Sequence, residues 1–226
     1  MDVTTRGGAG ATEASELPLP RMCPRTARLA LPGRRFDPWR LRWEASDAPP
    51  PGGLDLAPAD AVRALHAAGP VRGLPVGVIG PKIATARQVE IATTLGARIA
   101  DLGLQLVCGG KTGVMEAVCR GNLEAGGRPI GLVPDEEWDA GNDHVAIPLA
   151  TGIGPARNVL IARACFALVA VGGGYGTLSE IAFGLHFDRL VLSLEDAPRV
   201  EGALACANVD EACDRLARRF LRLDEA

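Results

Sequence analysis

The chain has 226 residues, a formal net charge of −3 and an apolar fraction of 47%. It is longer than a typical single domain and shorter than two, and its apolar content is that of a globular protein with a buried core. The acidic balance argues against nucleic acid or an anionic membrane as a partner. Because no apolar run approaches the ~20 residues that cross a bilayer and no secretory signal is visible, we expect a cytoplasmic protein.

The six cysteines show no C-x-x-C pair, and most of them lie in apolar stretches. Free cysteine in such a stretch behaves as a small hydrophobe. Buried thiols are therefore favoured over a disulfide framework or a zinc site. The three histidines are too scattered to form a ligand set, so we expect neither a bound metal nor a resident cofactor.

Residues 1–72 are rich in proline and arginine and differ from the rest of the chain. Residues 1–15 offer little to bury and are expected to be disordered. Residues 36–43 alternate two tryptophans with polar residues, which indicates an edge strand or a segment laid on the domain. Residues 58–68 are typical of a short helix with proline near its start. We interpret residues 1–72 as a partly disordered N-terminal extension, followed by a ligand-binding domain over 73–226.

Short apolar runs alternate with helical patterns from Leu74 onward. Apolar runs bounded by glycine or proline predict buried strands at 75–80, 104–108, 129–133, 145–147, 166–171 and 190–194. Apolar residues at helical spacing and strand-to-helix loops predict helices at 84–102, 113–125, 154–164, 175–185 and 210–221. This alternation specifies an α/β fold with a mostly parallel sheet and helices on both faces. A ligand is expected at the carboxyl edge of that sheet.

Three of the strand-to-helix loops are rich in glycine. They are Gly80-Pro81-Lys82, Gly109-Gly110-Lys111-Thr112-Gly113 and Gly172-Gly173-Gly174-Tyr175-Gly176-Thr177. Glycine lets backbone N–H groups approach an anion closely, and a helix N-terminus adds unpaired donors and partial positive charge. The alternative is a set of tight turns that need glycine only for their backbone angles. Three such loops at one sheet edge favour a phosphate site.

Lys82 and Lys111 are the only lysines, and both lie in these loops. In a chain that otherwise uses arginine, this placement indicates phosphate contact by a compact charge, with chance as the alternative. Two standard nucleotide motifs do not fit. Gln105 occupies the position where a P-loop requires its first glycine, and Thr177 occupies the position where the dinucleotide fingerprint requires its last glycine. We therefore expect no ATPase activity.

Residues 172–180 read GGGYGTLSE, which resembles the PGGxGTxxE motif of the LOG family, the cytokinin riboside 5′-monophosphate phosphoribohydrolases. Residues 109–115 resemble the earlier GGGxxGxM loop of that family, and Arg157 stands at the place of its catalytic arginine. The resemblance covers about residues 74–221. Within the wider group, the chain is most similar to bacterial nucleotide-binding proteins related to DprA/Smf. Molybdenum cofactor carrier proteins share the fold and the loop.

The resemblance implies a Rossmann-like, doubly wound fold and a homodimer or homotetramer. It implies a small phosphorylated ligand, either an AMP-like nucleotide or a pterin phosphate. Arg157 and Glu180 would be catalytic, because a carboxylate can stabilise the oxocarbenium-like centre of N-glycosidic cleavage while it orients water. The implied phosphate- and nucleotide-binding residues are Gly80, Lys82, Gly109, Gly110, Lys111, Thr112, Gly113, Met115, Asn158, Gly172, Gly173, Gly174, Tyr175, Gly176 and Thr177.

The sequence also departs from the LOG pattern at Gly172, Glu116 and Asn158, where the family has proline, glycine and lysine. Two hypotheses therefore stand. The first is a hydrolase that converts a nucleoside 5′-monophosphate to free base and ribose 5-phosphate, favoured by Arg157 and Glu180. The second is a non-catalytic nucleotide sensor or molybdenum cofactor carrier, favoured by the altered surroundings.

An acidic run at residues 135–139 follows the strand predicted at 129–133. A solvated loop is one interpretation of this run. The other is a lid over the ligand, because the run follows a strand at the functional edge.

Overall fold

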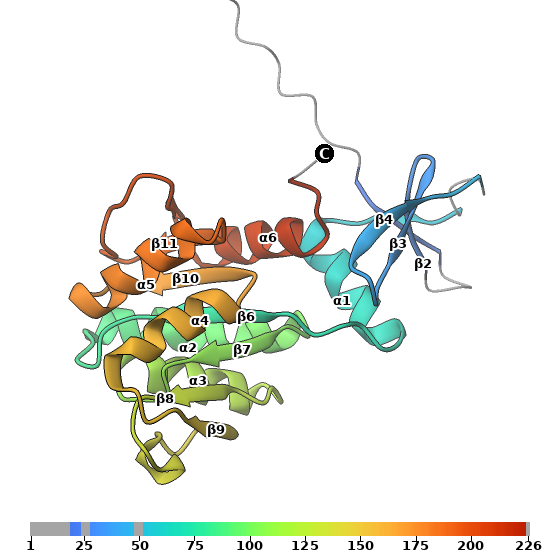
Figure 1. The fold of residues 1–226 in the computed structure, drawn as a ribbon. Coiled ribbons are helices and arrows are strands. Elements are labelled where there is room, and N and C mark those ends of the chain that lie inside the picture. The colour runs from blue at the N-terminus through green and yellow to red at the C-terminus, as the bar shows by residue number, and fades with distance from the viewer. Residues whose placement is uncertain (1–18, 24–27, 48–51, 225–226) are drawn as a thin grey trace, which may run out of the picture.

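The computed structural model describes residues 19–23, 28–47 and 52–224. The disorder expected for residues 1–15 lies outside these ranges. Seven parallel strands form the main sheet, in the order β12-β11-β10-β6-β7-β8-β9 (Figure 1). Their bounds are Pro75–Ile79 (β6), Gln105–Cys108 (β7), Ile130–Val133 (β8), Ile147–Ala150 (β9), Ala167–Val171 (β10), Leu190–Leu194 (β11) and Leu204–Ala205 (β12).

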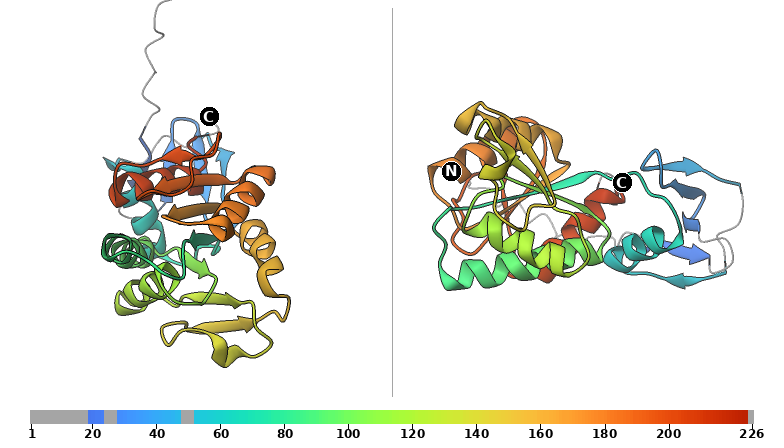
Figure 2. Two further views of the ribbon diagram at one scale, coloured as in Figure 1. Left: turned by 90° about the vertical axis from the view of Figure 1, so that its left-hand side faces the viewer. Right: turned by 90° about the horizontal axis from the view of Figure 1, so that it is seen from below.

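Helices cover both faces of this sheet, with α2 and α3 on one side and α4 and α5 on the other (Figure 2). The helices are Ala86–Asp101 (α2), Val114–Glu124 (α3), Asn158–Ala164 (α4), Tyr175–His186 (α5) and Val209–Phe220 (α6). Two 3-10 turns, Trp138–Ala140 (η1) and Gly154–Arg157 (η2), lie in the connections. The predicted α/β fold with a doubly wound, Rossmann-like sheet is confirmed.

The two faces of the sheet are apolar because its central strands are buried on both sides. Along β10, Val169 belongs to the core shared with α2, α3 and α6, whereas Leu168 belongs to the core shared with α4 and α5. The helices begin at clear signals. At the start of α2, Thr85 and Gln88 form a reciprocal capping box. Continuous apolar runs, together with the caps of α2 and α6, explain why the main sheet can be predicted from the sequence.

Differences from the prediction are confined to short elements. The strand predicted at 145–147 lies at 147–150 instead, because the Val145 N–H donates to Asn142 in a turn. The helix predicted over 154–164 begins as the 3-10 turn η2 before α4. The two-residue strand β12 was not predicted, because it is too short to carry a pattern.

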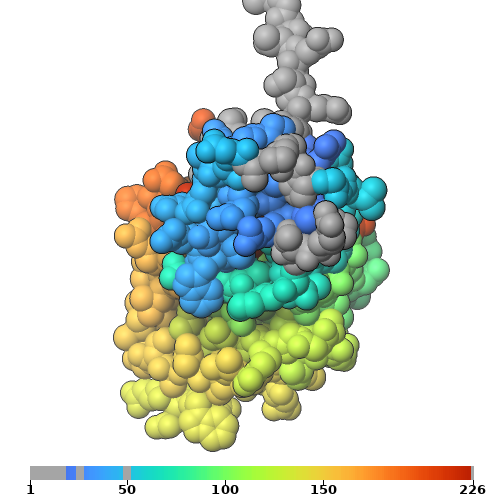
Figure 3. Space-filling view, turned by 90° about the vertical axis from the view of Figure 1, so that its right-hand side faces the viewer, coloured from blue at the N-terminus to red at the C-terminus, as the bar shows by residue number. Residues whose placement is uncertain are grey.

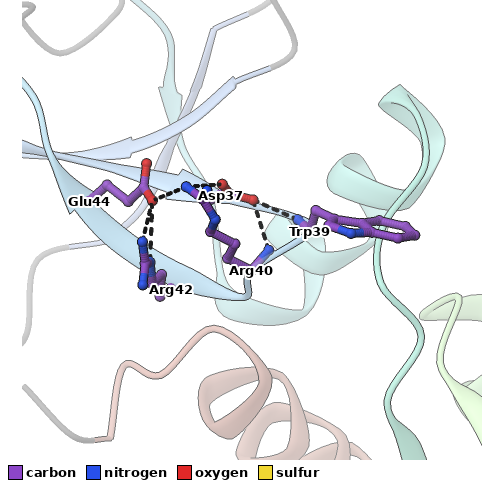
Figure 4. Close-up of polar contacts among 5 residues, drawn as sticks. All are labelled: Asp37, Trp39, Arg40, Arg42 and Glu44. Carbon is purple, nitrogen blue, oxygen red and sulfur yellow. Dashed lines mark hydrogen bonds and ion pairs between the residues drawn. The ribbon is translucent and has the colours of Figure 1, made fainter.

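A second, antiparallel sheet is built from the N-terminal region. Its strands, in the order β4-β3-β2-β1-β5, are Arg21–Cys23 (β1), Arg28–Leu31 (β2), Arg34–Asp37 (β3), Arg42–Ala45 (β4) and Leu54–Asp55 (β5). The single strand or surface segment expected over 36–43 is instead part of a hairpin between β3 and β4. Its turn forms because the Asp37 carboxylate accepts the N–H groups of Trp39 and Arg40 (Figure 4).

The small sheet joins the main core through helix α1, Pro58–Ala68, which begins and ends as predicted. Leu29, Phe36 and Leu41 belong to the same apolar cluster as the buried residues of α1 and α6. The indole N–H of Trp43 donates to the Leu221 carbonyl at 2.6 Å. The small sheet lies at the end of the molecule where the main strands begin (Figures 1 and 3). The opposite, carboxyl edge is left open. In the described part of the chain, no helix combines the length and apolarity needed to cross a membrane.

Candidate functional site

The chain order of the strands reverses at the centre of the main sheet. After β6 the chain adds β7, β8 and β9 on one side, and it then returns to add β10, β11 and β12 on the other. Ligands of such sheets bind at this switch point, outside the carboxyl ends of the strands. A cleft of about 560 Å³ opens there. It is lined by Gly80, Pro81, Lys82, Met115, Pro134, Asp135, Gly154, Pro155, Arg157, Asn158, Gly174, Gly176, Thr177 and Glu180.

The loop between β10 and α5 forms one end of the cleft. Gly172 and Gly173 have φ angles of +59° and +140°, which only glycine adopts without strain. A Cβ on Gly173 would lie 2.5 Å from the Cβ of Thr177. The loop therefore folds tightly onto the first turn of α5, where Gly174 is the N-cap and no side chain caps the helix. The first N–H groups of a helix have no intrahelical partner, so this end of the cleft suits a phosphate.

The loop after β6 brings a cation into the same cleft. β6 is the neighbour of β10 in the sheet, and Lys82 lines the cleft. Gly80 lets the loop pass closely, because a Cβ there would lie 2.6 Å from the side chain of Val114. A lysine ammonium beside a helix N-terminus adds a full positive charge to the partial charge of the backbone.

Arg157 and Glu180 form a buried ion pair on the cleft wall. Arg157 ends the turn η2, and Glu180 lies in the second turn of α5. Their closest atoms, Arg157 Nη1 and Glu180 Oε1, are 3.5 Å apart, and the side chains are 7% and 8% exposed. Arg157 Nη2 also donates to the Gly109 carbonyl at 3.1 Å. A Cβ on Gly109 would lie 2.2 Å from that Nη2, so a side chain at this position would displace the guanidinium.

Burial changes the acidity of both groups in this pair. It raises the pKa of Glu180 to about 7, against the opposing effect of the Arg157 charge. Burial also lowers the pKa of Arg157, which nevertheless remains a cation at neutral pH. A carboxyl group that titrates near neutral pH can accept or release a proton under physiological conditions. Arg157 Nε is buried and has no hydrogen-bond partner among the described residues, as expected where a ligand or water completes a site.

The predicted phosphate- and nucleotide-binding residues divide into two groups. Those that line the cleft are Gly80, Lys82, Met115, Asn158, Gly174, Gly176 and Thr177. Those outside its lining are Gly109, Gly110, Lys111, Thr112, Gly113, Gly172, Gly173 and Tyr175. The second group shapes the loops. Lys111 bonds to Asp135 Oδ2 at 2.9 Å and to the Ala140 carbonyl at 2.7 Å. Thr112 donates to the Lys82 carbonyl, and Tyr175 is 93% exposed.

The structure adds residues that the sequence analysis did not assign to the site. Pro81, Pro134, Asp135, Gly154 and Pro155 all line the cleft. For Asp135, the available signal was its place in the acidic run after β8, for which a lid over the ligand was one of the two interpretations. Among the described residues, no group of three or more His, Cys, Asp or Glu side chains could hold a metal ion.

The comparisons with known proteins cover the main sheet and its cleft. The sequence profile of the SLOG cluster4 family matches residues 73–215. An uncharacterized protein of Archaeoglobus fulgidus is 40% identical over 137 residues, which are 61% of this chain and 90% of that protein.

Two of the similar solved structures each cover about two thirds of the chain. The molybdenum cofactor carrier protein of Chlamydomonas reinhardtii is 32% identical, with a TM-score of 0.61 over 66% of this chain and 99% of that chain. The molybdenum cofactor binding protein of the phototrophic bacterium Rippkaea orientalis is 30% identical, with a TM-score of 0.61 over 64% and 96%. The small N-terminal sheet lies before the family match. The suspected LOG-like relationship is thus confirmed, and the chain belongs to the SLOG cluster4 family.

Proposed function

We propose that this protein binds a phosphorylated nucleotide in the switch-point cleft and hydrolyses its N-glycosidic bond. The observation that carries the proposal is the buried Arg157–Glu180 pair on the cleft wall. A buried pair of this kind costs desolvation energy and adds little stability, so its presence in a cleft favours a chemical role. The substrate class is a nucleoside 5′-monophosphate, and the products are free base and ribose 5-phosphate.

In this proposal the phosphate lies at the N-terminus of α5. The N–H groups of the first turn, the Thr177 hydroxyl and the Lys82 ammonium bind its oxygens. Glu180 lies one turn further along the same helix, within reach of the ribose attached to that phosphate. Met115 supplies an apolar surface for the base.

The reaction is a displacement at the anomeric carbon of the ribose. The bond from this carbon to the base nitrogen breaks, and its electron pair leaves with the base, which takes up a proton. A water oxygen forms the new bond to carbon, and the Glu180 carboxylate accepts the proton that this water loses. Glu180 then releases this proton to the solvent, which supplies the proton that the base takes up. The same carboxylate stabilises positive charge on the ribosyl centre, as carboxylates do in glycoside hydrolysis. Arg157 positions Glu180 and holds its charge in place.

The test is incubation of the purified chain with a panel of nucleoside 5′-monophosphates, with free base measured by chromatography. We expect base release from at least one nucleotide, and loss of release in Glu180→Gln with nucleotide binding kept. Glu124→Gln, which alters an exposed carboxylate at the end of α3, is the matched control and should leave turnover unchanged. Equal turnover in Glu180→Gln and the unaltered chain would exclude the catalytic role.

A second candidate is a non-catalytic sensor of a nucleotide or carrier of a pterin phosphate such as the molybdenum cofactor. The specific observation in its favour is that the similar solved structures are named as proteins that carry or bind this cofactor. The cleft would then use the same phosphate-binding loop without turnover. A thermal shift with a pterin phosphate, and no base release from any nucleotide, would support this candidate instead.

We also propose that the chain forms a homodimer or homotetramer. Leu160 on α4 and Leu178 and Phe183 on α5 are apolar side chains that are 42%, 38% and 38% exposed. Such residues on neighbouring helices support self-association. Light scattering of the purified chain would measure the oligomer directly.

A further inference from the structure

The loops that line the cleft follow five neighbouring strands of the sheet, β10, β6, β7, β8 and β9. In the order β10-β6-β7-β8, the loop after β10 forms the phosphate end, and Lys82 follows β6. Met115 lies on α3, which follows β7, and Asp135 follows β8. Because adjacent strands are about 4.8 Å apart, the carboxyl end of β8 lies about 14 Å from that of β10. Asp135 therefore follows a strand whose carboxyl end is well separated in the sheet from the one that precedes the phosphate-binding loop.

The Asp135 carboxylate is held in place by Lys111. The ammonium bonds to Asp135 Oδ2 at 2.9 Å and to the Ala140 carbonyl at 2.7 Å, which fixes it between the carboxylate and the following loop. The hydrogen bond from Lys111 also holds the pKa of Asp135 below its usual range. Asp135 is thus an ionised group that only accepts hydrogen bonds. A carboxylate has about four acceptor positions, and Lys111 occupies one of them.

A carboxylate in this position faces the heterocycle of a ligand whose phosphate lies at α5. Guanine and pterins share a 2-amino-4-oxo edge, on which a ring N–H and an exocyclic amino group are adjacent donors. Both can donate to one carboxylate in charge-assisted bonds. Adenine presents one amino donor beside a ring nitrogen lone pair, which a carboxylate repels.

We propose that Asp135 determines ligand specificity by accepting two hydrogen bonds from a 2-amino-4-oxo heterocycle, so that the cleft prefers a guanine nucleotide or pterin phosphate to AMP. The proposal rests on the proposed function, because it requires the phosphate to lie at the N-terminus of α5. Glu180 and Asp135 are the two carboxylates in the lining of the cleft, and Glu180 lies on the phosphate-binding helix itself. Recognition of the heterocycle by charge is therefore assigned to Asp135.

The experiment is isothermal titration of the full chain with four probes: GMP, IMP, AMP and 6-hydroxymethylpterin phosphate. The unaltered chain should bind GMP about 10-fold more tightly than AMP, since one good bidentate contact discriminates by about 1–3 kcal/mol. IMP should fall between them, because it keeps the ring N–H and lacks the amino group. Tight binding of the pterin phosphate with weak binding of GMP would show that the heterocycle bound in the cleft is a pterin and not guanine.

Asp135→Asn is the decisive variant because a carboxamide both donates and accepts, as the adenine edge requires. We expect it to lose affinity for GMP and gain affinity for AMP, which reverses the preference. Asp139→Asn is the matched control. It removes a nearby carboxylate of the same acidic loop that is not part of the cleft lining, and it should leave the preference unchanged. An unchanged melting temperature would show that both variants fold.

Two results would overturn the role of Asp135: AMP binding as tightly as GMP and the pterin phosphate, or an unaltered preference in Asp135→Asn. In either case all four probes could still bind, and the phosphate site of the proposed function would stand. Failure of every probe to bind would overturn the phosphate site and the specificity proposal together.

Discussion

The molecule contains two kinds of arginine–glutamate pair, and they differ in burial more than in distance. In the N-terminal hairpin, Arg40 and Arg42 contact Glu44 at 3.1 and 3.0 Å, and the arginines are 62% and 56% exposed (Figure 4). In the cleft, the contact of Arg157 with Glu180 is longer, at 3.5 Å, but both side chains are less than a tenth exposed.

The two pairs shift the acidity of their glutamates in opposite directions. Hydrogen bonds from Arg42 and Arg40 lower the pKa of Glu44, as expected for a half-buried carboxylate that water still reaches and that lies next to cations. Burial raises the pKa of Glu180 to about 7, although a cation lies beside it as well. At Glu180 burial outweighs the charge of the neighbouring arginine, whereas at Glu44 the hydrogen bonds from the arginines outweigh burial.

The largest effect is expected for Arg157→Met, which removes the cation and keeps much of the side-chain volume. Glu180 then stays buried without its counter-charge, so its pKa should rise above 7 and its carboxylate form should become scarce. We expect base release at pH 7 to fall about 100-fold or more, as when a preorganised charge is lost from an active site. Chromatography of released base measures this, and thermal melting checks that the variant folds.

Arg157→Lys is the matched variant, because it keeps a positive charge but loses the planar guanidinium that contacts both Glu180 and Gly109. Its turnover should lie between those of Arg157→Met and the unaltered chain. Full activity in Arg157→Met would show that the buried ion pair is not needed for catalysis.

A smaller effect is expected for Gly109→Ala. The new Cβ would lie 2.2 Å from Arg157 Nη2, and the end of a flexible side chain must move aside. We expect about a 10-fold loss of turnover, because a small displacement of a positioning group slows the reaction. Gly73→Ala is the control, since a Cβ there meets no atom within 4 Å. Equal activity of both alanine variants would show that the contact with Gly109 does not position the guanidinium.

The smallest effect is expected for Glu44→Gln in the hairpin. It removes the carboxylate from two exposed ion pairs, which water already screens. The melting temperature should stay within about 2 °C of the original, and base release should not change. A large loss of stability would mean that the fold of the hairpin depends on these ion pairs.

The main sheet could be predicted because its sequence signals are local. β10 is buried at all five positions and is flanked by a glycine-rich loop, so both the strand and its end are visible in the sequence. The small sheet could not be predicted in the same way. Its strands have two to four residues, and several of these residues are arginines. Strand β1 also pairs with β5 across more than 30 residues of sequence. Such short, non-local pairings leave no periodic hydrophobic pattern in the sequence.

The candidate site was predictable only to the level of its motifs. The loop at 172–180 and Arg157 were found by resemblance, and the structure brings Glu180 and Arg157 into contact. The hydrogen-bond partner of the Lys111 side chain could not be predicted from the sequence. Lys111 lies in a glycine-rich loop, but its partner Asp135 is 24 residues further along the chain. The sequence shows which loop carries a lysine. What that lysine contacts depends on which other loop lies beside it in the fold.

The most direct test of the buried pair is the pH dependence of base release between pH 5 and 9. The measurement uses saturating nucleotide, so that titration of the phosphate, which affects binding, does not enter. Because the carboxylate form of Glu180 is the active one, the rate should rise with pH, reach half its maximum near pH 7 and then level off. A rate that is flat or falls through pH 7 would contradict the assignment of Glu180 as the group that accepts the proton.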